Sequence, residues 1–298
     1  MKVILGNRNA LLGLVILAIF AAIALVGPIM VGDATAYVGL PLEPPSAAHW
    51  LGTNGQGQDV LAQTVAGARP TLMVGFIVGI AVVAIGAFIG TAAGYFGGRI
   101  DGALHLIINV FLVMPGLPLM VVIAAYLPPG PVTIAFVLIL TGWAWSARVI
   151  RSQALALRKQ DFVAASIVSG EGHLRIIVVE ILPNLLPLVA SAFIGATVYA
   201  IGAQVGLEFL GLGDVSQITW GTNLYWASND AALLTGSWWT FVPTGTCVAL
   251  VGFAMALVNH AIDEIGNPRL AAQPAYERAI ARAGVKPGHA TVVLKGKR

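Results

Sequence analysis

Long apolar runs, each of roughly twenty residues, restrict the folds open to this sequence more than any other feature. As an α-helix, such a run crosses the ~30 Å hydrocarbon core of a bilayer and satisfies its own backbone hydrogen bonds inside lipid. Only 10% of the residues are charged, far fewer than in an ordinary soluble domain. The sequence therefore predicts an all-α polytopic membrane protein with six transmembrane helices. The predicted spans are 10–31, 71–95, 103–126, 131–147, 185–207 and 238–262.

The Lys and Arg residues predict the orientation of these spans. With the N-terminus inside, all 16 of them except Arg69 fall on the cytoplasmic side, as the positive-inside rule requires. The predicted external segments carry acidic residues such as Asp33 and Glu43. We therefore expect both termini in the cytoplasm. Because topology segregates the positive charge, the net charge of +3 does not indicate a nucleic-acid partner.

The first apolar run has two interpretations. Lys2 and Arg8 precede it and Ala34-Thr35-Ala36 resembles a signal-peptidase site, so a cleaved signal peptide is one of them. The run, however, spans 10–31 and is longer than the ~7–15 residues of a signal-peptide core. A retained signal anchor is favoured, and residues 1–70 are then this helix plus an external loop. The single cysteine, Cys247, excludes a disulfide framework and a cysteine-based metal site.

Several residues inside the predicted spans suggest how the helices meet. Glycines spaced by four or seven residues share one face of the second span, where another helix can approach closely. That face predicts packing within the chain, with a moving contact to a partner subunit as the alternative. Pro115 and Pro118 predict a kink in the third span, either static or lining a pathway. The glycines are Gly75, Gly79, Gly86, Gly90 and Gly94.

The middle of each span lacks Asp, Glu, Lys and Arg. Secondary carriers and pumps usually need such a group as an ion or proton relay. A pathway lined by Asn109, Gln204 and hydroxyl side chains suits a neutral or zwitterionic polar solute. We therefore name Asn109 and Gln204 as candidate pathway residues.

The loop at 150–183, between the fourth and fifth spans, predicts a short cytoplasmic helix. The fourth helix is expected to extend out of the membrane to Lys159, and Asp161 to cap the next helix, which covers 162–169. Gly170 permits the turn that ends it, and Pro183 begins the fifth span. The helix exposes small apolar residues, so it needs either a protein partner or the lipid interface.

This loop resembles the EAA loop through which an ATPase moves the permease of an ABC-type importer. Aligned on Gly170, Leu182 and Pro183, the three motif positions are Ala164, Ala165 and Ser166, so the leading glutamate of the motif is missing. Glu180 also departs from the pattern, at a position that is often apolar. The resemblance assigns ATPase coupling to the following residues: Asp161, Ala164, Ala165, Ser166, Gly170, Leu182 and Pro183.

The external segment before the second span resembles the corresponding stretch of peptide and nickel permeases. It departs at Asn54, Gln58 and Gln63, where that family commonly has Asp, Arg and Arg. A later segment, from Glu208 to Leu224, resembles the same family, with Glu208 in place of a serine. The matching residues of the first segment are His49, Leu51, Gly52, Thr53, Gly57, Asp59, Val60, Leu61, Gly67, Ala68, Arg69 and Leu72.

The resemblance implies a type I ABC importer permease bundle in the cytoplasmic (inner) membrane of a prokaryote. Its implied partners are a second homologous permease, two cytoplasmic ATP-binding subunits, an extracytoplasmic solute-binding protein and membrane lipid. The permease core would cover 71–270, with five of the transmembrane helices, and 271–298 would be a basic cytoplasmic tail. Peptides or oligosaccharides are the implied cargo, and no cofactor or metal is expected.

The sequence also contains no motif for catalysis. It has no Walker A loop, since the terminal Gly296-Lys297-Arg298 lacks the upstream glycine and the Ser or Thr. Neither a His-Glu-x-x-His helix nor a Gly-x-Ser-x-Gly turn is present, which argues against an intramembrane hydrolase. We therefore predict a non-catalytic subunit. The alternative function is a secondary carrier or channel for a neutral polar solute.

Overall fold

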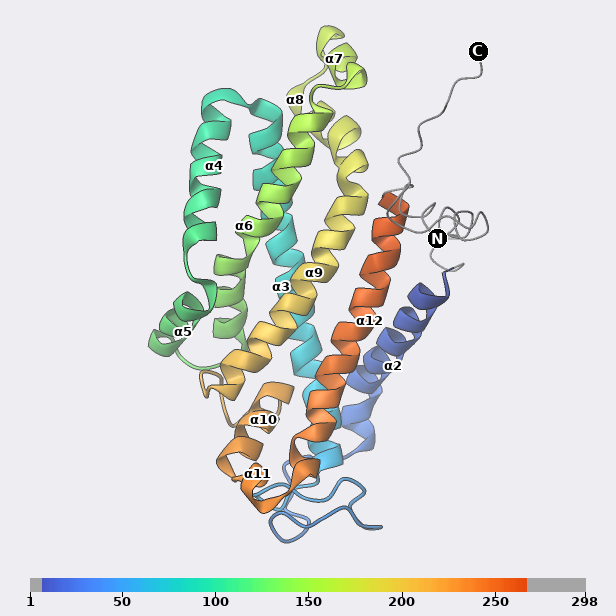
Figure 1. Cartoon of the computed structure of the whole chain (residues 1–298), viewed down its shortest axis with the longest axis vertical. Helices are drawn as coiled ribbons and strands as arrows, with labels where there is room; N and C mark the ends of the chain where they lie inside the picture. The colour runs from blue at the N-terminus through green and yellow to red at the C-terminus, as the bar shows by residue number, and fades with distance from the viewer. Residues whose placement is uncertain (1–6, 267–298) are drawn as a thin grey trace, which may run out of the picture.

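The computed structural model describes residues 7–266, and this part of the chain is an elongated helical bundle (Figure 1). Five helical segments are long and apolar enough to cross a membrane, and a bent pair of helices makes a sixth. These findings agree with the predicted all-α bundle of six spans. The five are α2 (Arg8–Met30), α3 (Val60–Phe96), α6 (Pro131–Leu157), the run 173–209 that ends in α9 (Leu182–Phe209), and 242–263 of α12 (Val242–Gly266).

The predicted third span is a broken helix. α4 (Gly98–Val113) ends just before Met114, and α5 (Gly116–Tyr126) begins after Pro115. The two helix axes are bent by 84° relative to each other. Proline lacks the amide hydrogen that would continue the α4 ladder, and it favours extended backbone in the residue before it. Met114 has that backbone, with φ −64° and ψ 134°. The predicted kink is thus a complete interruption, and α4 also begins five residues earlier than expected.

Helix α3 begins at Val60, eleven residues before the expected start of the second span. The reason is a cap: the Asp59 carboxylate accepts a hydrogen bond from the Ala62 amide at 3.0 Å, which satisfies one of the free donors of the first turn. Pro70 lies inside the helix. The external loop predicted to extend to residue 70 therefore ends at 59.

The glycine face of α3 packs against other helices of the same chain. A Cβ atom added at Gly86 would lie 2.9 Å from Ser146 Cβ and 3.0 Å from Ala147 N of α6. Gly90 and Gly94 also face α6, while Gly75 and Gly79 face α9. The predicted packing role of these glycines within the chain is confirmed. Their missing side chains bring the three helices into close contact.

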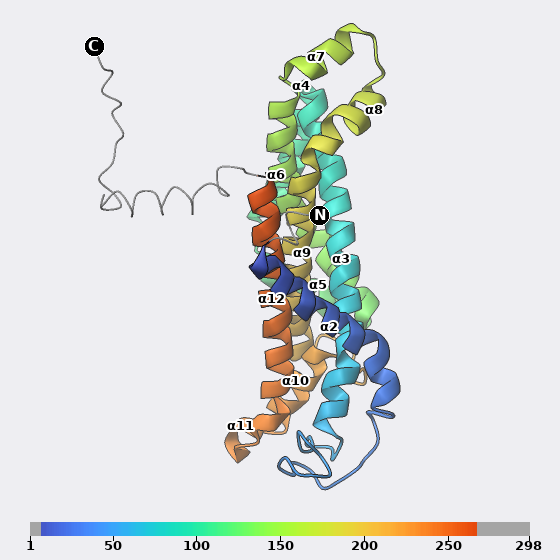
Figure 2. The same ribbon diagram turned by 90° about the vertical axis from the view of Figure 1, so that its right-hand side faces the viewer.

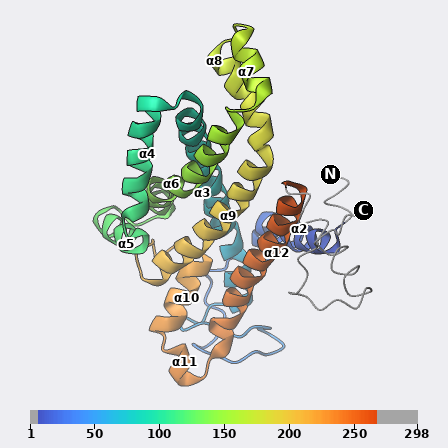
Figure 3. The same cartoon turned by 45° about the horizontal axis from the view of Figure 1, so that its top comes forward.

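The last span begins later than expected because Trp238–Thr240 forms a separate 3₁₀ turn, η2. α12 then begins at Val242, and Pro243 occupies its first turn, where proline costs no helical hydrogen bond. α2 crosses beside α12 and α3, as Figure 2 shows. α4 and α5 lie on the other side of the bundle from α2 and α12 (Figure 3). The predicted tail 271–298 lies outside the described residues.

The two ends of the bundle differ. One end carries α7 (Asp161–Val168) and α8 (His173–Arg175), and the opposite end carries the segment 31–59, α10 (Trp220–Asn229) and α11 (Ala232–Thr235) (Figure 1). The two regions singled out from the sequence, the EAA-like loop and the external segments, therefore lie at opposite ends.

Candidate functional site

The short helix α7 exposes most of its apolar surface. Val163 is its only buried residue, and it packs in a cluster with Ile150 and Ile176. Phe162 and Ile167 are exposed, and Val168 is 88% exposed. A helix of eight residues is too short to be stable by itself, so its contacts must hold it in place. Its outer face is therefore suited to contact another molecule.

The EAA-like positions lie on this outer face. Ala164 and Ala165 are exposed, and Ser166 is partly buried, with its hydroxyl donating to the Phe162 carbonyl at 3.1 Å. Asp161 was expected to cap the helix, but Gln160 occupies the cap position and its side chain makes no capping bond. Asp161 lies in the first turn instead, where its negative charge favours the positive end of the helix dipole.

Gly170 ends α7 in the left-handed conformation, with φ +77°. The Gly170 amide donates to the Ile167 carbonyl, and the Glu171 amide donates to the Ser166 carbonyl, both at 3.1 Å. These two bonds form a Schellman motif, which satisfies the free carbonyls at the end of a helix. The turn predicted at Gly170 is confirmed, and an L-residue at that position would be strained.

The return to the membrane passes through a π-helix, η1 (Ile176–Ile181), which continues directly into α9. Leu182 and Pro183 are the first residues of α9, so the predicted helix start at Pro183 is correct to one residue, although the continuous helical run that can cross a membrane begins at His173. Proline has no amide hydrogen to donate, and the wider turn upstream accommodates its ring. Leu182 is partly buried and Pro183 is exposed.

A hydrogen bond that sequence reasoning missed attaches this loop to α3. The Tyr95 hydroxyl lies 2.8 Å from Nδ1 of His173, at the start of α8. Phe96 packs edge-on against both rings, and the Arg158 guanidinium donates to the Phe96 carbonyl at 3.2 Å. Tyr95 is only 4% exposed. No sequence motif links positions 95 and 173, and only the fold brings them together.

A cavity of ≈ 550 Å³ lies among α3, α4, α6, α9 and α12. Its wall is mainly apolar and includes a few hydroxyl and amide groups. It belongs to the helices that connect the two ends of the bundle, and its size is in the range of a small-molecule site. Its polar lining residues are Thr141, Ser146, Ser191, Tyr199 and Asn259.

The two predicted pathway residues lie outside this cavity. Asn109 is on α4, where its amide nitrogen lies 3.3 Å from Nε2 of His105, and it borders an open apolar hollow with Val110 and Val113. Gln204 is fully buried in α9, and its amide donates to Oε1 of Glu208 at 3.0 Å. The Gln204 side chain therefore reaches no open surface in this conformation.

At the end of the cavity nearer α7, a polar group joins α9 to α12. The Ser191 hydroxyl lies 2.9 Å from Oδ1 of Asn259 and 2.8 Å from Oδ1 of Asp263. The sequence pattern did not predict this group, because Ser191 lies in an apolar run. Within the described residues, His, Cys, Asp and Glu side chains nowhere gather in threes to hold a metal ion.

The segments that the sequence predicts to be external form a connected platform at the opposite end. Trp220, the first residue of α10, is fully buried: its amide donates to the Thr71 hydroxyl at 3.0 Å and its indole to the Thr64 carbonyl at 2.9 Å. These bonds fasten α10 to the first turns of α3. Nearby, the Gly55 amide donates to Asp230 at 3.1 Å. Burial raises the pKa of the Asp230 carboxyl.

The three positions that depart from the peptide and nickel permease pattern lie together in this platform. The side-chain carbonyl of Gln58 accepts from the Asn54 amide at 2.9 Å and from the Gln63 amide at 3.0 Å. Three residues that are commonly charged in that family are thus replaced by one uncharged hydrogen-bonded group. The spacing in the sequence did not reveal that they touch.

Comparison with known proteins gives concordant results. Residues 86–265 match the family model described as the binding-protein-dependent transport system inner membrane component. A dipeptide transport system permease of Bacillus subtilis is 33% identical over 269 residues, covering 89% of this chain and 83% of that protein. An oligopeptide transport system permease of the same organism is 31% identical, covering 89% and 87%. A nickel transport system permease of Escherichia coli K12 is 32% identical, covering 93% and 100%.

Proposed function

Since this chain belongs to the family of binding-protein-dependent transport system inner membrane components, we propose that it moves peptides or oligosaccharides inward and couples to an ATPase through α7. It is a multi-pass inner-membrane permease of an ABC importer of the peptide and nickel family. It is not the catalytic subunit, because ATP hydrolysis in these systems resides in a separate chain. Because the family assignment is that of an ABC importer permease, no observation now favours the alternative function of a secondary carrier.

The exposed apolar face of α7 supports the coupling proposal. Val168 and Ile167 are exposed at the end of the bundle where the predicted cytoplasmic loops gather. The bonds of Gly170 and the contact between Tyr95 and His173 fix how the helix is presented. A helix that is fixed to the bundle by these contacts and exposed on its outer face can transmit a partner's movement to the bundle.

The implied complex holds this chain, a second permease, two ATP-binding subunits and a solute-binding protein. We place the α7 end and both termini in the cytoplasm, because the basic residues Arg158 and Lys159 directly precede α7 and Arg151 lies in the last two turns of α6. The platform around α10 then faces outward, toward the binding protein. Closure of the ATPase pair would move α7 and tilt α9, to which it is joined by η1.

The cargo proposal rests on the relatives and on the cavity. Relatives are named for the transport of dipeptides, oligopeptides and nickel. The ≈ 550 Å³ cavity offers hydroxyl and amide groups, which suit an uncharged or zwitterionic solute. We therefore propose Ser191, Tyr199 and Asn259 as pathway residues in place of Gln204, and Asn109 stays a candidate outside this cavity.

Site-directed photo-crosslinking in native membranes tests the coupling proposal. A photoreactive amino acid at Val168 should crosslink to the ATP-binding subunit, identified by mass spectrometry through its Walker A peptide. The matched control is Leu234 on α11, which is 90% exposed at the opposite end and should not reach that subunit. Absence of the adduct at Val168, in a complex shown to contain the ATPase, contradicts the coupling role.

Uptake into reconstituted vesicles tests the rest of the proposal. The complex is purified with its binding protein, and uptake of a labelled tripeptide and of maltotriose is measured with ATP and without it. Uptake of one of the two solutes only with ATP supports an importer and assigns its cargo. Uptake driven by an ion gradient in the absence of ATP would instead favour a secondary carrier.

A further inference from the structure

A second cavity lies in the platform around α10, far from both α7 and the membrane cavity. It measures ≈ 160 Å³ and is enclosed by the segment 31–59, the first turn of α3, residues 215–218 and α10. We call it the amide pocket, after its main lining residues: Gln56, Gln58, Gln63, Gln217, Asn223 and Trp226. Its volume is far above the ~10–15 Å³ that a single water needs. The pocket therefore has room for a small chemical group.

All of the residues lining the amide pocket are uncharged. The carboxylates of Asp33 and Asp214 accept hydrogen bonds from two of these lining residues, Thr35 and Ser216. A negatively charged group entering the pocket would therefore lose its water, gain no cation and lie near two like charges, which is costly. The side chains offer both amide donors and carbonyl acceptors, and an amide can serve as either. The lining therefore favours an uncharged group that both donates and accepts hydrogen bonds.

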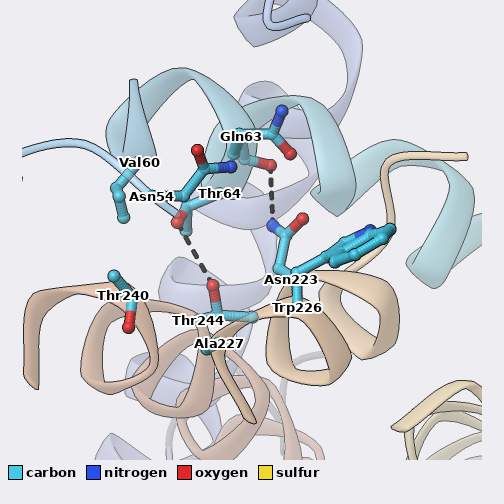
Figure 4. A pocket seen from close by; sticks show the side chains of 9 residues that line it. All are labelled: Asn54, Val60, Gln63, Thr64, Asn223, Trp226, Ala227, Thr240 and Thr244. Carbon is cyan, nitrogen blue, oxygen red and sulfur yellow. Dashed lines mark hydrogen bonds between the residues drawn. The ribbon is translucent and has the colours of Figure 1, made fainter. Parts of the chain in front are cut away.

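Bonds to the surrounding protein hold the lining in place. The Gln63 amide donates to the Ala34 carbonyl at 2.6 Å, and the Asn223 amide donates to the Gln63 backbone carbonyl at 3.1 Å. The Trp226 indole donates to the Val215 carbonyl at 3.0 Å. Figure 4 shows a smaller adjoining cavity of ≈ 20 Å³, which shares Gln63, Asn223 and Trp226 with the amide pocket. The polar wall is thus fixed before any ligand arrives.

Some polar atoms of this wall remain available. Among the described residues, the side-chain carbonyl of Gln63 has no hydrogen-bond partner, whereas the side-chain nitrogen of Gln63 donates to Ala34 and to Gln58. The side-chain amide of Gln56 likewise makes no bond within the described part of the chain. These atoms are free for a ligand or for ordered water.

We propose that the amide pocket binds an uncharged hydrogen-bonding group of the transported solute, either sugar hydroxyls or a peptide amide. This inference rests on the proposed function, because it places the pocket on the side from which solute arrives. The pocket would hold one unit of a longer solute by its polar groups, with the apolar face of Trp226 as a wall. It would reject a unit that carries a negatively charged side chain.

The test measures binding to the full-length chain in lipid nanodiscs by saturation-transfer NMR, so it needs neither the ATPase nor the binding protein. The probes are maltotriose, trialanine blocked at both ends, and blocked triglutamate as the anionic comparator. We expect maltotriose or blocked trialanine to bind, and triglutamate to bind at least about tenfold more weakly, because its carboxylates would find no cation and would lie near Asp33 and Asp214. Binding of maltotriose alone identifies a sugar site, and binding of trialanine alone identifies a peptide site.

The variant Gln56→Leu removes an amide that holds no other described residue, and it should weaken binding about fivefold to tenfold, as expected for one lost hydrogen bond. The matched control is Gln153→Leu, an exposed position on α6 near the opposite end. Thermal unfolding of both variants should equal that of the unmodified chain. Absence of binding by both uncharged probes, or equal binding in Gln56→Leu, overturns the site. The permease assignment would stand in that case, since ATP-dependent uptake tests it separately.

Discussion

Gly170 and Gly172 lie two residues apart in the loop after α7, yet their backbones differ. Gly170 has φ +77°, which is unfavourable for a residue with a Cβ atom, whereas Gly172 has φ −68° and ψ 144°, which any residue adopts. Neither has a neighbour within 4 Å of an added Cβ. Substitutions at these two positions therefore differ in backbone strain alone, because a larger side chain has space at both.

We predict that Gly170→Leu uncouples the transporter. Holding Leu in the left-handed conformation costs on the order of 1–2 kcal/mol, so the Schellman motif should open and α7 should lose its fixed presentation. The complex should still assemble and hydrolyse ATP, but import fewer solute molecules per ATP. Reconstituted vesicles give both rates. Gly172→Leu should keep the normal ratio, and a normal ratio in Gly170→Leu would rule out the coupling role of this turn.

Tyr95→Phe is predicted to loosen the same loop from the membrane side. The change removes only the hydroxyl that lies 2.8 Å from His173, while the ring can keep its edge contacts with Phe96. The lost bond should cost about 0.5–1.5 kcal/mol of stability and lower the number of solute molecules imported per ATP. Tyr126→Phe, at a residue that is 88% exposed, is the control for losing a tyrosine hydroxyl. A stability loss with an unchanged import ratio would mean that the contact is purely structural.

At the scale of elements, the close packing of α3 against α6 predicts a sharp difference between two glycines. In Gly86→Ala the new methyl group meets Ser146 and Ala147, so the helices must separate, at a cost of about 1–3 kcal/mol. Gly202 of α9 has open space, and Gly202→Ala should be neutral or slightly stabilising. Thermal unfolding of the purified chain in detergent measures both. Equal unfolding temperatures for Gly86→Ala and Gly202→Ala would show that the α3–α6 interface accommodates the extra methyl group at little cost in stability.

Much of this element pattern followed from the sequence, for physical reasons. Hydrophobic length predicted the spans, Gly170 predicted the end of α7, Pro183 predicted the start of α9 to within one residue, and the prolines predicted a kink where the structure has a complete break. Cooperation between distant residues could not be predicted. The anchoring of α8 depends on the bond between Tyr95 and His173, and the contact between α9 and α12 includes the bond from Ser191 to Asp263. A one-dimensional pattern carries no information about such pairs.

At the scale of the whole molecule, α3 connects the two functional ends. It is a single helix of 37 residues, about 55 Å long at 1.5 Å per residue. Near one end Tyr95 bonds to His173, close to α7, and about 36 Å away along the helix the Thr71 hydroxyl accepts from the Trp220 amide of α10. The helix is also locked sideways against α6 and α9 by its glycines. We therefore expect that displacement of the α7 end of α3 also displaces its α10 end, because the helix moves as a rigid body.

This arrangement predicts that the two attachments of α3 act on coupling as a unit. Thr71→Val leaves the buried Trp220 amide without its acceptor, and Tyr95→Phe frees the loop, so each alone should lower the import per ATP. If both changes interrupt the same mechanical connection along α3, the double variant should import no fewer solute molecules per ATP than the more severe single variant. Stability effects at sites this far apart normally add, so unfolding measured on the same proteins provides the internal control. Additive losses in both measurements would mean that each attachment matters only locally, and that another helix carries the motion between α7 and α10.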